Sequence, residues 1–425
     1  MNHCTMVGWA IAVLGALSTV SASATAADDE AGRRILLQQT LKKQLTLELP
    51  TSGNWTQPIS FVTRMIARQS DPKPTLDVAA KYWHSVIKSP RHDTVRGGFF
   101  SADPSAQSQP HKSLLEQACI AEVLMDAVQI GGHDGSREAA DVAKGLFTFV
   151  LRDLRLATGG FAETDALTTT QPVNQPPVRE MLNPSWNGLM VAALARGSVV
   201  FGNQDYYTAA AQTEEFLLTR CTTADDCLSV MHGALALYQA AGEARWLAAA
   251  INLQDRMDRE FWDEATVTYR LNDLSQIPKE LGIINLLRLT TITDDDAFRE
   301  RAKVLLTTAI TKNGGDLLQN PGLLCAIDQQ LGPSPHLTIV GDPAAIDTRA
   351  LFSTAHRRYQ PHLVIVTHAA DPVQKELRKR FPAMVPVPKV QGKATAYLCI
   401  GMMCNRPVTE PAALDKQVTE ISYSW

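Results

Sequence analysis

The sequence of 425 residues has no cluster of lysine or arginine long enough to follow a phosphate backbone, and its formal charge is only −4. This scarcity of clustered positive charge excludes nucleic acid as an expected partner. After the N-terminus the sequence also has no uninterrupted apolar run of the roughly 20 residues that cross a bilayer. Hydrophobic residues make up 45% of the chain and aromatic residues 6%. That content suffices for one extended core and a small second unit.

The N-terminus has the features of an export signal. Residues 6–17 form an uncharged apolar stretch, and small residues at 22, 24 and 26 fit the A-x-A cleavage pattern. An uncleaved anchor is the alternative, but the stretch is shorter than the roughly 20 residues of a membrane span. We therefore expect residues 1–26 to be removed as a signal peptide, and the mature chain to be secreted or periplasmic.

Cysteines occur in two closely spaced pairs. Cys221 and Cys227 flank the turn TTADD, and Cys399 and Cys404 flank IGMM. In an oxidising compartment each pair is expected to form a disulfide. A zinc site is disfavoured because neither pair has histidines at ligand spacing, so we expect no metal. Two further cysteines on apolar helical stretches are expected to be buried thiols: Cys119 and Cys325.

Two kinds of helical segment alternate between about residue 111 and residue 331. The first kind is apolar nearly all round, as in helices that are buried on every side. These segments are 114–129, 187–202, 227–242 and 281–289. The second kind carries its charges on one face. These segments are 136–154, 204–220, 244–262 and 296–310. The alternation predicts a toroid of helical hairpins, with the first kind inside and the second kind outside.

Further helical segments complete the toroid. They lie at 30–47, 57–69, 75–88 and near 316–331. Together with the four pairs they give about 12 helices, which is enough for six hairpins. The fold class is therefore mainly all-α, an (α/α)6 toroid. The sequences RGGFF (96–100) and TGGFA (158–162) each follow an outer helix and predict tight reversals at one mouth of the toroid.

After Pro333 short apolar strands alternate with helices. The strands are expected at 336–342, 362–368 and 394–400, and the helices at 347–359 and 371–381. This part is too short for a dinucleotide domain and has no glycine-rich phosphate loop. The expected organisation is a signal peptide (1–26), a toroid (27–333) and a small α/β segment (334–425).

Several segments resemble the thioredoxin-domain-containing family related to spermatogenesis-associated protein 20. The most specific are the Trp-Asn-Gly helix start at 186–188 and the TAYLC-x4-C-x2-PVT sequence at 395–409, within a resemblance that covers roughly 57–415. The resemblance implies a six-hairpin toroid, similar in fold to N-acylglucosamine 2-epimerase and six-hairpin glycosidases, with a C-terminal α/β segment. No C-x-x-C occurs and fewer than 60 residues precede the toroid. We therefore expect the family's thioredoxin domain and its redox activity to be missing.

The expected toroid mouth departs from the family's pattern. Lys112 and Asp226 match it, whereas Glu116 replaces an aspartate, Gln117 replaces an asparagine, and residues 277–279 replace a serine-glycine-asparagine motif. The resemblance thus implies a retained scaffold with a changed mouth.

Inner helices of such a toroid direct their N-termini toward one mouth, where the helix dipole and free N–H groups favour hydroxyls and anions. A tryptophan beside amides and carboxylates is suited to hold a sugar ring. The expected ligand-binding residues are Trp186, Asn187, Gln117, Lys112 and Asp93, and the starts of later helices add Lys279 and Glu280. The alternative is that Trp186 is a core residue and that Asn187 caps its helix.

Two reactions compete if the chain is an enzyme. Epimerisation or isomerisation needs a base and an acid on opposite faces of a carbon, usually histidines. The histidines near the mouth are His92, His111 and His232. Glycoside hydrolysis needs two carboxylates, for which Asp93, Glu116 and Asp226 are available. Neither set forms a recognisable motif. The catalytic candidates are Glu116, Asp226 and His232.

The sequence therefore predicts an exported toroid that binds a carbohydrate-like small molecule at its mouth and, if catalytic, processes it without a cofactor. The competing class is a noncatalytic structural or interaction module. An open acidic and aromatic funnel would favour the first class. A mouth plugged by residues 91–110 or 163–184 would favour the second. The oligomeric state is left open.

Overall fold

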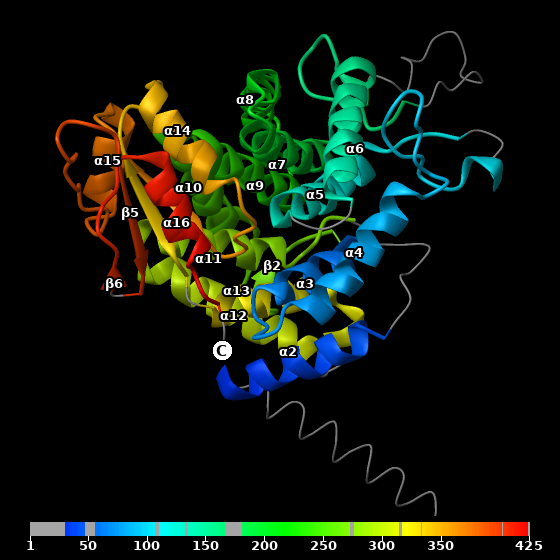
Figure 1. The fold of residues 1–425 in the computed structure, drawn as a ribbon, viewed down its shortest axis with the longest axis horizontal. Helices are drawn as coiled ribbons and strands as arrows, with labels where there is room; N and C mark the ends of the chain where they lie inside the picture. The colour runs from blue at the N-terminus through cyan, green and yellow to red at the C-terminus, as the bar shows by residue number, and fades with distance from the viewer. Residues whose placement is uncertain are drawn as a thin grey trace, which may run out of the picture.

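Six helices form a closed inner ring in the described part of the chain. The computed structural model describes residues 30–46, 56–106, 110–131, 135–165, 181–272, 276–313, 317–332, 334–401 and 403–423, so the predicted signal peptide lies outside it. Each ring helix packs against the next, and the last packs against the first (Figure 1). The ring is α3 (Thr56–Ile66), α5 (Leu114–Ile130), α7 (Pro184–Phe201), α9 (Ala224–Ala241), α11 (Leu281–Thr293) and α13 (Pro321–Leu331).

Each ring helix has an outer partner. Five of the partners follow their ring helix directly in sequence: α4 (Lys73–Ile87), α6 (Ser136–Phe149), α8 (Gln204–Leu218), α10 (Ala244–Arg256) and α12 (Asp296–Lys312). The sixth partner is α2 (Glu30–Gln44), which precedes the ring in sequence and packs against α13 and α3 (Figure 1). The predicted toroid of six hairpins is confirmed, and so is the predicted order of inner and outer helices.

Capping residues explain where the ring helices begin. The Asn183 side chain accepts a hydrogen bond from the backbone of Trp186, and Pro184 occupies the first turn. Thr223 and Asp226 form a capping box at the start of α9. Both helices therefore begin three residues before the predicted starts at 187 and 227. Gly202 and Gly242 end these helices with positive φ, as is usual for glycine at a helix C-terminus.

The C-terminal unit has the three predicted strands, one further short strand and one further helix. Its sheet has the order β4-β3-β5-β6, with β4 parallel and β5 antiparallel to β3. The strands are β3 (His336–Val340), β4 (Val364–His368), β5 (Thr395–Ile400) and β6 (Met403–Cys404). The helices are α14 (Ile346–Ala355), α15 (Pro372–Arg380) and the unpredicted α16 (Pro411–Thr419). The sheet contacts the ring through β4, which packs against α9 and α11.

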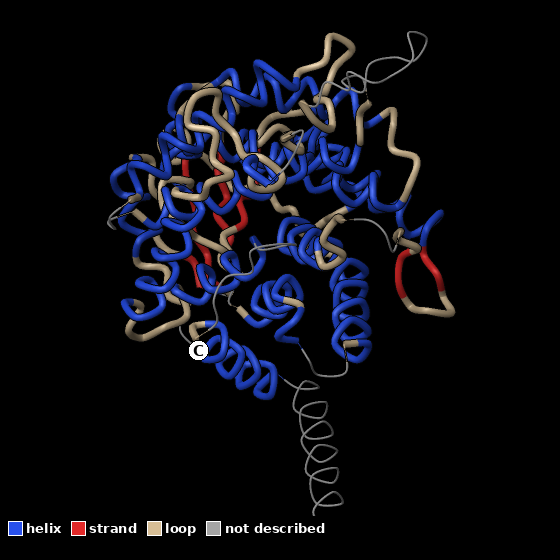
Figure 2. Tube along the Cα trace, turned by 90° about the vertical axis from the view of Figure 1, so that its right-hand side faces the viewer, coloured by secondary structure: helices blue, strands red, loops and turns tan. Residues whose placement is uncertain are grey.

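Helices dominate the rest of the trace (Figure 2). A short hairpin, β1 (Trp262–Asp263) and β2 (Thr268–Tyr269), follows the outer helix α10. Two outer helices end in π-helical turns, Val150–Leu154 after α6 and Met257–Phe261 after α10. In the ranges that the structure describes, no helix is both long and apolar enough to cross a membrane.

The two cysteine pairs differ in the structure. Cys399 and Cys404 lie opposite each other in the β5–β6 hairpin and form a disulfide. Cys221 and Cys227 are both free thiols, so the expected second bridge is not formed. The Cys221 thiol donates toward the carbonyl oxygen of Leu217 at 3.4 Å, while Cys227 lies in the first turn of α9. The structure therefore contradicts the expected Cys221–Cys227 disulfide.

Residues 355–365, from the last residue of α14 to the second residue of β4, lie across the C-terminal ends of the ring helices; we call them the floor segment. Gln129, near the end of α5, donates to the His356 carbonyl oxygen at 2.6 Å. Gln239, near the end of α9, bonds both the N–H and the carbonyl oxygen of Ile365. The C-terminal unit therefore contributes a segment to the toroid itself.

One buried carboxylate fastens the floor segment to the ring. Asp328 of α13 accepts hydrogen bonds from Arg68 at 2.8 Å, Arg64 at 3.0 Å and His362 at 2.9 Å. Burial alone would raise the pKa of Asp328, but His362 and the two arginines hold that pKa well below its usual value. Burial lowers the pKa of His362 to about 4, so a neutral imidazole donates to the carboxylate at neutral pH.

We expect Asp328→Ala to lower the free energy of unfolding by about 3–5 kcal/mol, because it removes the carboxylate that two buried guanidinium groups share. The matched control is Asp255→Ala, which removes a partly exposed pair with Arg380 and should cost less than about 1 kcal/mol. Urea unfolding followed by circular dichroism measures both changes. Similar losses for the two variants would contradict the role assigned to Asp328.

The floor segment should also make stability sensitive to acid. Burial lowers the pKa of His356 to about 4, and its Nε2 donates to the Gln239 carbonyl oxygen at 3.0 Å. An unfolded histidine has a pKa of about 6.5. Between these two values the unfolded chain binds more protons, so stability falls as the pH falls, by about 1.4 kcal/mol per pH unit for each such group.

His356→Gln removes one of these groups and keeps a donor for Gln239. Between pH 6.5 and pH 4.5 the free energy of unfolding of this variant should therefore fall less steeply than that of the parent. Urea titrations at several pH values give the two slopes. Parallel slopes would show that His356 is not a buried neutral group.

Candidate functional site

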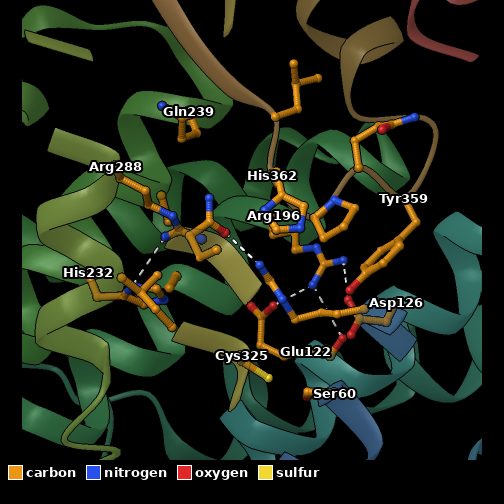
Figure 3. A pocket seen from close by; sticks show the side chains of 18 of the residues that line it. Ser60, Glu122, Asp126, Arg196, His232, Gln239, Arg288, Cys325, Tyr359 and His362 are labelled. Atoms are coloured by element: carbon orange, nitrogen blue, oxygen red, sulfur yellow. Dashed lines mark hydrogen bonds and ion pairs between the residues drawn. The ribbon is translucent and has the colours of Figure 1, made fainter. Parts of the chain in front are cut away.

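A cavity of about 360 Å³ lies inside the inner ring, and all six ring helices and the floor segment line it (Figure 3). Its volume is near the lower end of the roughly 300–1,000 Å³ that is usual for small-molecule sites. The lining residues include several charged side chains and glutamine amides, among them Gln57, Gln129 and Gln239. The centre of the toroid is thus a polar chamber and not a filled apolar core.

One cluster in the cavity joins α5 to α7. Glu122, Asp126 and Gln129 follow one face of α5 at spacings of four and three residues, which places them side by side. Arg196 of α7 donates to Glu122 Oε2 and to Asp126 Oδ1, each at 2.6 Å, and to Gln129. Burial raises the pKa of Asp126 to about 6; Arg196 opposes this rise and Glu122 adds to it. Two carboxylates therefore share one guanidinium.

A third carboxyl group lines the cavity at the start of α11. Glu280 accepts a hydrogen bond from Gln57 Nε2 at 2.6 Å, and burial raises its pKa. No cation among the described residues pairs with Glu280. Its carboxyl group lies against Gly322 of α13, where a Cβ atom would stand 1.4 Å from Glu280 Oε1. A larger side chain at position 322 would therefore displace the Glu280 carboxyl group from this contact.

Arg288 and His232 face the cavity from α11 and α9. Figure 3 draws them on the opposite side from Asp126 and Tyr359. Arg288 Nη1 lies 3.4 Å from His232 Nδ1, and Nδ1 lies 2.9 Å from Asn285 Oδ1. Burial lowers the pKa of Arg288 to about 10, which still leaves it charged at neutral pH; Glu122 opposes the shift. Burial, helped by Arg288, lowers the pKa of His232 to about 3, so this imidazole is neutral.

Of the residues predicted at the mouth, only His232 and Glu280 line the cavity. Two others hold the glycine turns. Gln117 accepts from the N–H of Phe99 and donates to its carbonyl oxygen, both at 2.8 Å. Asn187 makes the same two bonds with Phe161, at 2.7 and 2.9 Å. Both amides are fully buried, so their hydrogen bonds are used by the protein itself.

The remaining ligand-binding candidates also have partners in the protein. Lys112 Nζ is buried and donates to Asp93 Oδ2 at 2.8 Å and to the carbonyl oxygen of Gly97 at 2.7 Å. Asp93 also accepts from the backbone of Val95 and Arg96. Trp186, like Asn187 on the first turns of α7, is half-buried and packs against the main core.

The carboxylate candidates at the helix starts are engaged as well. Glu116 forms an ion pair with Arg91. Asp226 accepts from Ser185 Oγ at 2.8 Å and from the backbone N–H groups of Thr222 and Thr223. The structure thus brings these residues to the N-terminal ends of the ring helices, outside the lining of the cavity.

Among the other mouth histidines, His92 stacks on Phe99, and its Nδ1 lies 3.1 Å from the carbonyl oxygen of Ile87. His111 lies just before α5 and does not line the cavity. In the residues that the structure describes, no group of three or more histidine, cysteine, aspartate or glutamate side chains is arranged to hold a metal ion.

The sequence does contain a signal for the cavity residues. The apolar ring segments carry isolated charges, namely Glu122 and Asp126 in α5, Arg196 in α7 and Arg288 in α11. A charge on a helix that is buried on all sides must face a polar interior or a buried partner. In a toroid that polar interior is the lumen.

Comparison with known proteins gives matches over part of the chain. No family model matches. Spermatogenesis-associated protein 20 from Rattus norvegicus is 28% identical in an alignment over 277 residues that covers 55% of this chain and 35% of that protein. The human protein of the same name is 26% identical in an alignment over 287 residues that covers 57% of this chain and 36% of that protein. The matched stretch therefore spans only about a third of these curated relatives.

Two solved structures are also similar. One is a glycoside hydrolase family 76 mannosidase from Bacteroides thetaiotaomicron, with 12% identity, a TM-score of 0.44 and coverage of 64% of this chain and 84% of that one. Another is a sugar epimerase from a ruminal bacterium, with 13% identity, a TM-score of 0.41 and coverage of 54% and 70%. The sequence matches carry the relationship: over about half of its length, this chain is homologous to spermatogenesis-associated protein 20, of the thioredoxin-domain family.

Proposed function

We propose that the chain binds a carbohydrate-like small molecule inside the inner ring, in the cavity between Arg196 and Arg288. The observation that carries this proposal is the cluster of Glu122, Asp126 and Arg196 on the wall of a chamber of about 360 Å³. Charged groups that line an internal chamber are costly to bury unless they serve a ligand or each other. The proposed site is therefore the lumen of the toroid.

The lining is suited to a hydroxyl-rich ligand. A polyol presents donors and acceptors around its edge and weakly apolar faces between them. Amides and carboxylates on several helices can form hydrogen bonds with the hydroxyls, and apolar side chains can pack against the faces of the ring. The apolar part of the lining includes Ala118, Leu189, Ala236, Leu281 and Ile284.

Processing of the ligand would need an acid and a base at the reacting carbon. General acid–base groups work best with a pKa near the working pH. Asp126, with a pKa raised to about 6 by burial, meets this need, and we assign it the acid–base role if the chain is catalytic. Burial lowers the pKa of His232 to about 3, so this imidazole is a neutral hydrogen-bonding group on the other side of the cavity. Glu116 and Asp226 are less suited, because they are engaged in an ion pair and a helix cap.

Export is part of the same proposal. The apolar stretch at 6–17 supports it, and the Cys399–Cys404 disulfide is consistent with an oxidising compartment. A noncatalytic interaction module remains the alternative class, since the polar groups at the N-terminal ends of the ring helices are used within the protein.

We expect the chain to be stabilised by a mono- or disaccharide. A ligand at 100 times its dissociation constant should add about 2.7 kcal/mol to the free energy of unfolding. Glu122→Gln should weaken the binding of that ligand about tenfold, because charge-assisted hydrogen bonds are worth about 1.5–3 kcal/mol. A thermal-shift screen followed by calorimetric titration measures both effects.

The matched control is Glu215→Gln on the outer helix α8. It makes the same change in a surface ion pair, which Glu215 forms with Arg245 of α10. Its affinity for the ligand should equal that of the parent. If no carbohydrate binds saturably, or if both variants lose affinity equally, the lumen is not a carbohydrate site and the interaction module is favoured.

A further inference from the structure

We infer that the ligand of the cavity is a sugar acid, and that Arg288 binds its carboxylate. This inference rests on the proposed function and narrows it to one chemical class. It depends on the geometry around Arg288, on the contrast with the other arginines of the lumen, and on the charges that face Arg288 across the cavity.

Arg288 has no anionic partner in the described part of the chain. Glu122 is the one carboxylate whose charge supports it, and Glu122 forms its ion pair with Arg196. The polar group in contact with Arg288 is His232, whose Nδ1 lies 3.4 Å from Nη1. A guanidinium that borders a cavity without a counter-ion is able to receive an anion from outside.

The contact with His232 does not satisfy Arg288. Asn285 Nδ2 donates to the carbonyl oxygen of Leu228 at 3.1 Å, so its Oδ1 faces His232 and accepts the proton of Nδ1 at 2.9 Å. With Nδ1 acting as a donor, Arg288 and His232 present two donors to each other. This tautomer leaves Nε2 of the neutral imidazole as an acceptor, which can take a hydrogen bond from a ligand hydroxyl.

The other lumen arginines are paired. Arg196 donates to two carboxylates and a glutamine amide. Arg64 donates to Asp328 at 3.0 Å and to Gln329 at 2.6 Å. Partners of this kind compensate the desolvation of a buried cation. Arg358, the fourth arginine of the lining, pairs with Asp415. Arg288 is the exception among the four, and it lies on the opposite side of the cavity from Asp126 (Figure 3).

The charges of the site favour a carboxylate over a phosphate ester. A single guanidinium neutralises one negative charge and matches a carboxylate in a bidentate manner. A dianionic phosphate would leave excess negative charge in the chamber that holds Glu122 and Asp126. The hydroxyls of a sugar acid, by contrast, can donate to those two carboxylates. A ligand with a carboxylate at one end and hydroxyls at the other therefore fits both walls.

The first experiment titrates the full-length protein with matched pairs of compounds by isothermal calorimetry. The pairs are glucuronate with glucose, galacturonate with galactose, and mannuronate with mannose, together with the three corresponding 6-phosphates. We expect at least one uronate to bind about tenfold or more tightly than its hexose, because it adds a charge-assisted pair. The corresponding 6-phosphate should bind more weakly than that uronate.

The second experiment changes the charge of the site. In Arg288→Met the ratio of the hexose to the uronate dissociation constant should fall to near one, and Arg288→Lys should retain part of the preference. The melting temperature of Arg288→Met without ligand should not fall, because no ion pair is lost. The control is Arg259→Met, which removes an exposed cation paired with Glu260 and should keep the full ratio.

The outcomes separate this inference from the proposed function. Equal affinity for hexoses and uronates would overturn the sugar-acid assignment and leave a carbohydrate site. Tighter binding of a 6-phosphate would overturn the carboxylate. A lower melting temperature for Arg288→Met, or an unchanged preference, would show that Arg288 has a structural role. Binding of none of these compounds would overturn both the inference and the proposed function.

Discussion

The buried carboxylate of Asp328 joins three parts of the chain that are far apart in sequence. It lies on α13, accepts hydrogen bonds from Arg64 and Arg68 of the α3 region, and accepts a third from His362 of the floor segment. The ring closes at the contact between α3 and α13, and the floor segment lies across the ring at the same place. The closure of the ring and the seating of the C-terminal unit therefore depend on one network.

Such a network fixes geometry more than it adds stability. The desolvation of buried ions offsets most of their attraction, so apolar residues of the same volume could stabilise a ring equally well. A buried cluster of charged groups, however, has few arrangements in which every group has an ion-pair or hydrogen-bond partner. We interpret the Asp328 network as a device that holds α3, α13 and the floor segment in one register. The walls of the cavity are built on these elements.

The charged side chains that line the described part of the lumen have partners within the protein, with one exception. Arg64 and Arg196 have carboxylate partners, and Glu280 has an amide partner. Arg288 contacts only the donor side of a neutral imidazole in the described structure. Sites that bind ligands commonly keep groups that the folded protein alone does not satisfy, at a cost in stability. Arg288 therefore indicates the chemistry of the ligand more clearly than the charged groups that have partners within the protein.

At the N-terminal ends of the ring helices α5 and α7, the two preceding glycine turns are held by the same pair of side-chain to backbone hydrogen bonds. Gln117 and Asn187 each bind both backbone groups of the aromatic residue that follows a Gly-Gly pair. The glycines have positive φ, and a side chain at Gly160 would meet Leu182 and Asn187. The polar residues that the sequence placed at a ligand-binding mouth are therefore largely parts of turns. Sequence alone could not separate these roles, because an amide that binds backbone and one that binds sugar have the same identity and spacing.

The sequence by itself determined the helices of the toroid, their inner and outer order and three strands of the C-terminal unit, because these follow from side-chain periodicity over one or two turns. It also carried the family resemblance in its Trp-Asn-Gly and C-terminal motifs. Only the tertiary structure decided that α2 pairs with α13, that residues 355–365 cover the lumen, and that Arg196 faces Glu122 while Arg288 faces no anion. These facts depend on contacts between segments that are tens to hundreds of residues apart, and local periodicity carries no information about which distant side chains meet.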